Sequence, residues 1–214
     1  MKHLIALFIF CLVMAVQFVS AEPQRLSSNT LIHYELPGDK WQVSSTPPQL
    51  AIDAMYADLV FGKKQKGEDY DPEKLRQMAT KFVQINNLYI YNEESEAYLM
   101  ISISPFDEKH GPPKKKHIKK SAKWAVDAIL EHADVSDLSS FTSSTSFIEV
   151  PGMNYAARID ADYPMFGEPH HFIGIIGYSH PYWVFMYYND KLKDSDDLKE
   201  MKNIISSIKF DRMK

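Results

Sequence analysis

Apolar residues alternate with polar ones in several segments of the chain, and each such segment predicts a β-strand with one buried face. Residues 88–105 are typical of a hairpin, and residues 153–162 alternate after Pro151-Gly152, a pair that favours a type II turn. The segment GEPHHFIGIIGYSHPYWVFMYY, residues 167–188, predicts two more strands, 170–178 and 183–188. We expect these two strands to form a hairpin and the first of them to pair with residues 153–162.

Apolar residues at helical spacing predict the helices. The clearest helix begins near Ile118 and ends near Ala133, and another follows Asp71-Pro72, a favourable N-cap and first-turn pair. A third follows the acidic cluster at residues 194–197. Residues 47–62 suit a helix, although a buried strand at the end of this segment fits the same pattern. Strands in hairpins together with three or four helices predict an α+β fold with a mainly antiparallel sheet.

The first 21 residues predict a cleaved signal peptide. Lys2 precedes an apolar run from Leu4 to Phe18, and Val19-Ser20-Ala21 puts small residues where a signal peptidase cuts. An uncleaved anchor is the alternative, but the run is short for a membrane span of about 20 residues. We therefore expect a signal peptide at 1–21, a flexible polar tail at 22–30 and one domain at 31–214, in a periplasmic or secreted bacterial protein.

The composition excludes several classes of function. The single cysteine, Cys11, lies in the predicted signal peptide, so the mature chain has no disulfide, thiolate nucleophile or cysteine metal ligand. The net charge is −4, from 24 basic and 28 acidic residues, and becomes −5 when Lys2 is removed with the signal peptide. This balance argues against nucleic acid as a partner. After signal cleavage no apolar run is long enough to form a transmembrane segment.

Three segments resemble parts of one known family. Residues 32–45, IHYELPGDKWQVSS, resemble the opening strand, Pro-Gly turn and tryptophan of PsbP-like proteins, which include the bacterial DcrB-like proteins. VPGMNYAARIDADYP, residues 150–164, is similar to the family's middle turn and strand. YWVFMYYNDKLKDSDDLKEMKNIISSIKF, residues 182–210, is similar to its closing strand, acidic-capped helix and Ser-Ile-Lys-Phe ending.

This resemblance covers about a third of the mature chain, and residues 47–85 fit it least. It implies a three-layer α/β/α sandwich, in which helices flank both faces of a mainly antiparallel sheet. It also implies a non-catalytic accessory or binding protein, and it carries over no active-site motif.

One pentapeptide within residues 167–188 is similar to a hydrolase motif. Gly177-Tyr178-Ser179-His180-Pro181 matches the Gly-x-Ser-x-Gly nucleophile elbow except that proline replaces the second glycine. An elbow requires a strand, a sharp turn and then a helix, whereas a strand follows here. The motif therefore favours an ordinary hairpin turn, and a hydrolase is the third-ranked function.

The base of the predicted hairpin carries a candidate metal site. Its tip, with His180, lies roughly 25 Å from His170 at ~3.3 Å per residue, so these histidines cannot share one ion. The strand pairing is expected to put Asp162 near His170, and carboxylates with a histidine suit a divalent metal. An ordinary surface ion pair with Arg158 is the alternative. The candidate ligands are Asp160, Asp162, Glu168, His170 and His171. No other cofactor is expected.

A run of lysines is the strongest patch of one charge. It opens the helix that begins near Ile118, where cations oppose the helix dipole at a cost of a few tenths of a kcal/mol. That cost hints at a role in binding an acidic partner or anionic lipid headgroups, although a solvated helix start is the more common explanation of such a run. The candidate partner-binding residues are Lys114, Lys115, Lys116, Lys119 and Lys120.

The strand at residues 183–188 is apolar on both faces. Trp183, Phe185 and Tyr187 share one face, which either belongs to a covered central strand or lines a ligand groove. The sequence therefore favours a non-catalytic binding or accessory protein of the cell envelope, with a protein or small ligand as its partner and peripheral contact with the membrane as an option. The alternative is a metal- or small-ligand-binding protein that uses the Asp160, Asp162 and His170 end of the hairpin.

Overall fold

The computed structural model describes residues 19–212, apart from residues 28, 108, 110, 133–138 and 166. Its centre is a seven-stranded sheet in the order β5-β6-β7-β11-β10-β9-β8, and every pair of neighbouring strands in it is antiparallel. These strands are β5 (Gln42–Ser44), β6 (Leu88–Asn92), β7 (Ala97–Pro105), β8 (Thr142–Ile148), β9 (Tyr155–Met165), β10 (Glu168–Ser179) and β11 (Tyr182–Asp190). The predicted α+β class with a mainly antiparallel sheet is confirmed.

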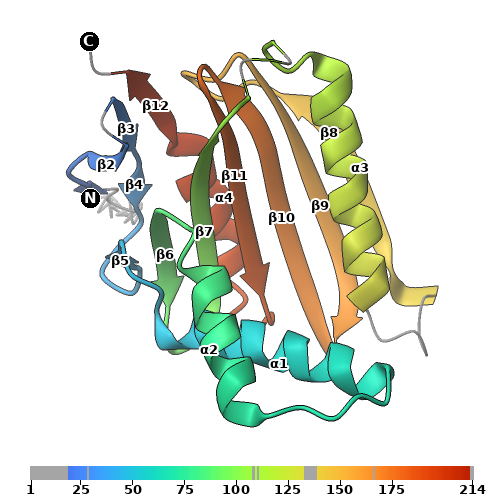
Figure 1. Ribbon diagram of the computed structural model, residues 1–214. Coiled ribbons are helices and arrows are strands. Elements are labelled where there is room, and N and C mark those ends of the chain that lie inside the picture. The colour runs from blue at the N-terminus through green and yellow to red at the C-terminus, as the bar shows by residue number, and fades with distance from the viewer. Residues whose placement is uncertain are drawn as a thin grey trace, which may run out of the picture.

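Two smaller sheets lie beside the central sheet (Figure 1). One has the order β12-β3-β2, and the other pairs β1 with β4. Their strands are β1 (Val19–Ser20), β2 (Gln24–Ser27), β3 (Thr30–His33), β4 (Glu35–Leu36) and β12 (Lys209–Arg212). The predicted flexible tail at 22–30 is wrong, because β2 pairs with β3 and Leu26 is buried in the core. Signal cleavage after Ala21 would remove β1, and the apolar run at 4–18 lies outside the described residues.

Four helices complete the described part of the fold: α1 (Gln49–Gln65), α2 (Pro72–Val83), α3 (Lys115–His132) and α4 (Asp197–Ser207). The helical interpretation of 47–62 is confirmed, and the alternative of a buried strand there is wrong. Asp71 caps α2 as expected, with its carboxylate accepting from the amides of Glu73 and Lys74. In α2, Leu75, Ala79 and Val83 are buried, while Met78 and Phe82 are exposed. None of the described helices is long and apolar enough to cross a membrane.

Alternate side chains of the central strands enter two separate cores. On β10, Ile173 and Ile175 pack in a core that includes α4 and the small β12-β3-β2 sheet. Phe172 and Ile176 pack on the opposite face, in a core that includes α3. Helices α3 and α4 therefore lie on opposite faces of the sheet (Figure 1). The three-layer α/β/α sandwich stays a prediction, because the face covered by α4 also carries a second sheet.

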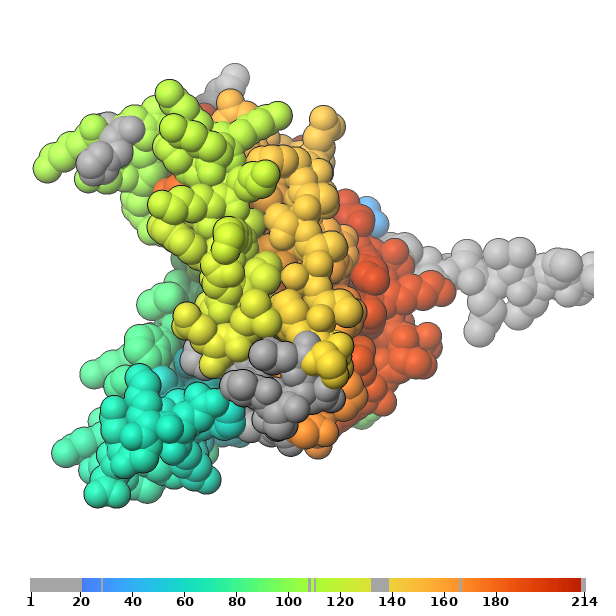
Figure 2. Space-filling view, turned by 90° about the vertical axis from the view of Figure 1, so that its right-hand side faces the viewer, coloured from blue at the N-terminus to red at the C-terminus, as the bar shows by residue number. Residues whose placement is uncertain are grey.

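Helix α1 lies on the same face of the sheet as α3. Its buried Ala51 packs with Tyr89 of β6, and the cluster extends to Met100 of β7. Met100 pairs with Tyr187, which packs in the α3 core. In Figure 2 α3, in yellow-green, and the α1–α2 pair, in teal, project from one side of the molecule with a hollow between them. That hollow leaves part of the sheet face without a covering helix.

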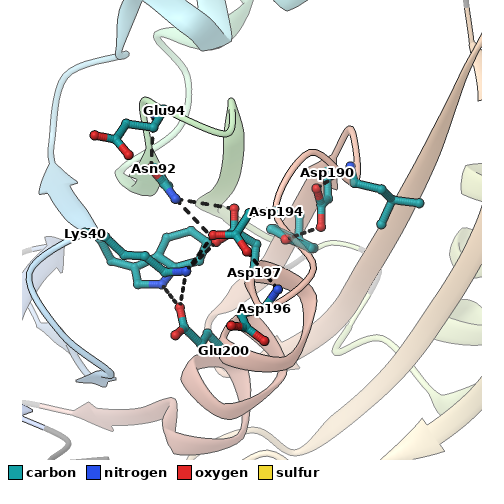
Figure 3. A network of polar contacts seen from close by, with 11 residues as sticks. Lys40, Asn92, Glu94, Asp190, Asp194, Asp196, Asp197 and Glu200 are labelled. Carbon is teal, nitrogen blue, oxygen red and sulfur yellow. Dashed lines mark hydrogen bonds and ion pairs between the residues drawn. The ribbon is translucent and has the colours of Figure 1, made fainter.

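An ionic network fixes the start of α4 to the segment before β5 (Figure 3). The Lys40 ammonium lies 2.9 Å from Asp197 and Glu200 and 3.1 Å from Asp194. The Trp41 indole donates to Glu200 at 2.8 Å, and the Asn92 amide donates to Asp197 at 3.3 Å. Burial disfavours the Lys40 charge, but the hydrogen bonds that its ammonium donates to three carboxylates outweigh that effect and raise the Lys40 pKa above its ordinary value.

Candidate ligand-binding cleft

A cleft of about 670 Å³ opens between α1, the C-terminal part of α3 and the sheet. Its volume lies within the range of small-ligand sites. Helix α1 supplies one wall with Leu50, Ala54 and Ala57, and α3 supplies another with Ala128 and Ile129. The cleft therefore occupies one end of the hollow between these helices (Figure 2).

Aromatic side chains from three strands line the sheet side of the cleft. They are Tyr98 of β7, Tyr163 of β9 and Phe172 of β10. The centroid of the Phe172 ring lies 5.7 Å from that of Tyr187 on β11. Phe185 and Trp183 extend this row of rings along β11, and the centroids of successive rings in it are 6.2 Å apart. These three β11 rings are only half-buried, whereas Val184, Met186 and Tyr188 on the other face are fully buried. The expectation of a strand covered on both faces thus holds for one face only.

The remaining lining of the cleft is strongly acidic. Six carboxylates and one lysine line it: Asp53, Asp58, Glu93, Glu96, Glu168, Asp190 and Lys191. Some of these charges are already balanced, since Glu96 pairs with Lys191 and Asp53 pairs with Arg76 at 2.8 Å. Glu93 and Glu168 are exposed and make no ion pair within the described part of the chain. The cleft consequently combines an apolar aromatic floor with a negative electrostatic potential.

The polar groups on the floor are held in their neutral forms. Burial, and then the charge of Asp58, raise the pKa of Tyr98 and of Tyr163 well above the ordinary value of tyrosine. Burial lowers the pKa of His170, whose ring stacks on Tyr163 with centroids 5.8 Å apart. His170 Nδ1 lies 3.1 Å from the Glu168 carbonyl oxygen, to which a neutral imidazole can donate. The fixed negative charge of the cleft therefore comes from its carboxylates alone.

This arrangement suits an organic cation with an apolar body. Aromatic faces attract cations through their quadrupole, and carboxylates add a direct Coulombic attraction. Leu50, Ile129, Met165 and the small alanines of α1 and α3 offer contacts for hydrocarbon. An anion would meet repulsion from the same carboxylates, so the lining selects by charge.

The five predicted metal ligands are divided between the two faces of the sheet. Glu168 and His170 line the cleft, but Asp162 pairs with His171 on the other face, where Asp162 Oδ1 lies 2.6 Å from His171 Nδ1. Asp160 pairs with Arg158 at 2.6 Å, as the ion-pair alternative expected. Among the described residues no three His, Cys, Asp or Glu side chains gather closely enough to hold a metal ion. The expected single cluster is therefore not formed, because neighbouring residues on a strand point to opposite faces.

The serine motif forms the tip of the β10–β11 hairpin, as expected from the strand that follows it. Ser179 pairs with Tyr182, which leaves His180 and Pro181 in the turn. The Ser179 hydroxyl donates to the Gly152 carbonyl oxygen at 2.7 Å, and His180 Nδ1 lies 2.7 Å from the Tyr178 hydroxyl. Serine and histidine thus have separate partners and do not form a nucleophile–base pair.

The predicted lysine run lies at the start of α3, remote from the cleft lining. All five lysines are exposed. Lys114 donates its backbone amide to His117 Nδ1 at 3.2 Å, which satisfies one amide at the helix N-terminus.

Most residues that line the cleft were not predicted from the sequence. Of the metal candidates only Glu168 and His170 line it, while Asp53, Asp58, Tyr98 and Tyr163 carried no motif. One available signal was the strand at 183–188, because aromatic residues on a strand face suited a ligand groove as well as a core.

Comparisons with known proteins concern the fold. No protein-family model matches the chain, and no curated protein sequence matches it. Among solved structures, the chain is similar to cyanobacterial PsbP from Synechocystis sp. PCC 6803, with TM-score 0.46, 7% identity, and 85% of this chain and 86% of that chain covered. It is also similar to LpqN, involved in cell envelope biogenesis of Mycobacterium tuberculosis, with TM-score 0.44, 11% identity and 91% of each chain covered. A PsbP structure is thus among the neighbours, as the sequence resemblance predicted. With TM-scores below 0.5, neither neighbour transfers a function to this chain.

Proposed function

We propose that this chain is a non-catalytic binding protein of the cell envelope that holds an organic cation with an apolar body in the cleft between α1, α3 and the sheet. The observation that carries the proposal is the combination of an aromatic floor with six carboxylates and one lysine in a single cleft of about 670 Å³. The predicted signal peptide supports the location in the envelope.

Two observations favour binding over catalysis. Ser179 and His180 have separate hydrogen-bond partners, so the one nucleophile motif of the chain lacks its base. In the cleft, the raised pKa values of Tyr98 and Tyr163 keep both hydroxyls protonated, so neither tyrosine is available as a general base. These groups can orient a ligand, whereas the carboxylates supply its counter-charge.

A pair of probes that are similar in shape and opposite in charge tests the ligand class. Phenylpropyl-trimethylammonium and phenylpropane sulfonate share an aromatic ring and a linker but carry opposite charges. We expect isothermal titration calorimetry to detect the cation with a dissociation constant of roughly 1 mM or tighter, and to detect no binding of the anion. Equal binding of both probes, or binding of the anion alone, contradicts the proposal.

Variants of the cleft locate the binding. Glu93→Gln with Glu168→Gln removes two exposed lining carboxylates and should weaken cation binding by roughly five- to tenfold. Glu73→Gln with Glu149→Gln removes the same charge from exposed positions that do not line the cleft, and serves as the matched control. Phe172→Leu should weaken binding as well, because leucine keeps an apolar contact but has no aromatic face. If the control pair weakens binding as strongly as the cleft pair, the cation is bound elsewhere.

A further inference from the structure

The outer surface of α3 carries a second charged feature, opposite in sign to the cleft. Its first half presents exposed lysines in every turn, and no acidic residue occurs in its first turn. We call this surface the basic face, defined by Lys114, Lys115, Lys116, Lys119 and Lys120. On the remaining side of the helix Ile118 and Ala122 are buried against the sheet, so the lysines point away from the core.

Exposed aromatic rings flank the basic face on both sides. Trp124 on α3 is 59% exposed, Phe147 on β8 is 49% exposed and Tyr155 on β9 is 37% exposed. The ammonium of Lys120 lies 4.5 Å from the Trp124 ring, and that of Lys115 lies 5.8 Å from both the Phe147 and Tyr155 rings. Lysines and aromatics therefore form one continuous surface and not two separate patches.

We propose that the basic face and its flanking aromatic rings dock the protein on a bilayer surface rich in anionic phospholipid. Each lysine near such a surface strengthens association by about fivefold. Tryptophan and tyrosine favour the interface between headgroups and hydrocarbon, where the long lysine side chains can extend to the phosphates. Helix α3 lies on the exterior of the molecule and projects from it (Figure 2), so it can lie flat on a membrane.

The exposed rings favour lipid over an acidic protein as the occupant. A purely electrostatic protein contact has no need of three large rings held open to water at the border of the lysines. The surface is also convex, because it is the outer side of a helix, and so it offers no groove for a peptide. The whole chain has a net charge of −4, so attraction to anionic lipid depends on this local concentration of lysines.

Vesicle co-sedimentation tests the proposal with the full chain. We expect binding to vesicles of 30% phosphatidylglycerol in phosphatidylcholine, weak binding to pure phosphatidylcholine, and loss of most of the difference in 0.5 M NaCl. The variant with Lys115, Lys116, Lys119 and Lys120 all changed to Gln should bind anionic vesicles at least ~100-fold more weakly. Every variant has the same apolar run at residues 4–18, so this run cannot produce a difference between them.

A second quadruple variant controls for total charge. Lys64, Lys66, Lys74 and Lys81 are exposed on or beside α1 and α2, and changing all four to Gln alters the net charge equally. This control should bind anionic vesicles nearly as well as the unaltered chain. If it loses binding to the same extent, or if the basic-face variant binds normally, the proposal is wrong.

Fluorescence distinguishes lipid contact from a general acidic partner. Trp124→Leu should abolish most of the blue shift that anionic vesicles induce in tryptophan emission, because Trp41 is buried and Trp183 lies half-buried on the sheet. Polyglutamate binding without any vesicle binding would overturn the lipid proposal in favour of an acidic protein. Cleft variants such as Glu93→Gln with Glu168→Gln should leave vesicle binding intact, so the outcomes for the cleft and the basic face are separable.

Discussion

The Nζ atom of Lys40 lies 2.9 Å from Oδ1 of Asp197, a carboxylate whose side chain has no exposed surface (Figure 3). Asp194 and Glu200 contact the same ammonium from the solvent side, where they are partly exposed. A buried carboxylate requires a counter-charge or hydrogen-bond donors, and here Lys40 and Asn92 provide them. This contact joins the chain before β5 to the first turn of α4, which are more than 150 residues apart.

Replacing Lys40 with Met should lower the free energy of unfolding by about 2–3 kcal/mol, because Asp197 stays buried without its cation. This loss of stability is smaller than that expected for a fully buried ion pair, because Lys40 is 34% exposed. Adding Asp197→Asn should recover part of the loss, because a neutral amide needs no counter-charge. Lys123→Met, which breaks an exposed pair with Asp127, is the control and should cost at most about 0.5 kcal/mol. Urea unfolding measures all four proteins, and equal losses for the two lysine variants would refute the prediction.

His170 should make stability depend on pH below neutrality. Burial holds its folded-state pKa below the value of 6.5 expected in the unfolded chain. The unfolded chain therefore takes up this proton first, so the contribution of His170 is fully present above about pH 6.5 and is lost as the pH falls toward the folded pKa. The limiting slope is about 1.4 kcal/mol per pH unit.

Chemical unfolding between pH 7.5 and 5 checks this dependence. His170→Gln should flatten the curve relative to the unaltered chain, because glutamine does not titrate. Phe172→Leu, on the same face of β10, should lower stability by a similar amount at each pH and so leave the slope unchanged. A slope for His170→Gln equal to that of the original chain would show that this histidine does not contribute.

The sequence located the main strands and helices because their periodicities are strong. It predicted the pairing of β9 with β10 but displaced the register by one residue, placing Asp162 beside His170 when its partner is His171. The cause is the turn, since the strands continue to Met165 and Glu168 and leave a much shorter connection than the expected loop. A shift by one residue exchanges the faces of every side chain, so a small error in turn length dispersed the predicted metal cluster.

Two other features had no periodic signal. Strand β8 contains TSSTSFI and lies at the sheet edge with nearly every residue exposed, so it lacks the apolar alternation by which strands are recognised. The cleft depends on which part of an apolar sheet face the helices leave open. That depends on where α1 lies, and α1 buries only Ala51 among its residues. The local sequence pattern therefore cannot predict the position of a helix that packs as loosely as α1.

Ser179 should matter for stability and not for catalysis. Its hydroxyl donates to the Gly152 carbonyl, so Ser179→Ala removes one hydrogen bond and should lower the free energy of unfolding by about 1 kcal/mol. Hydrolysis of p-nitrophenyl acetate by the purified chain should not change in this variant, because His180 is not positioned to activate the hydroxyl. A loss of hydrolysis in the folded Ser179→Ala protein would reinstate the nucleophile.

Gly152 and Gly62 should respond to alanine in opposite directions. Gly152 has φ +85°, and an added Cβ would lie 1.9 Å from the carbonyl oxygen of Phe210, so the turn before β9 and the start of β12 must move apart. Gly152→Ala should therefore cost roughly 3 kcal/mol or more. At Gly62, inside α1, an added Cβ meets nothing within 4 Å, and alanine should stabilise the helix by about 0.5–1 kcal/mol. Thermal and urea unfolding of both variants give the comparison, and destabilisation by Gly62→Ala would contradict the prediction.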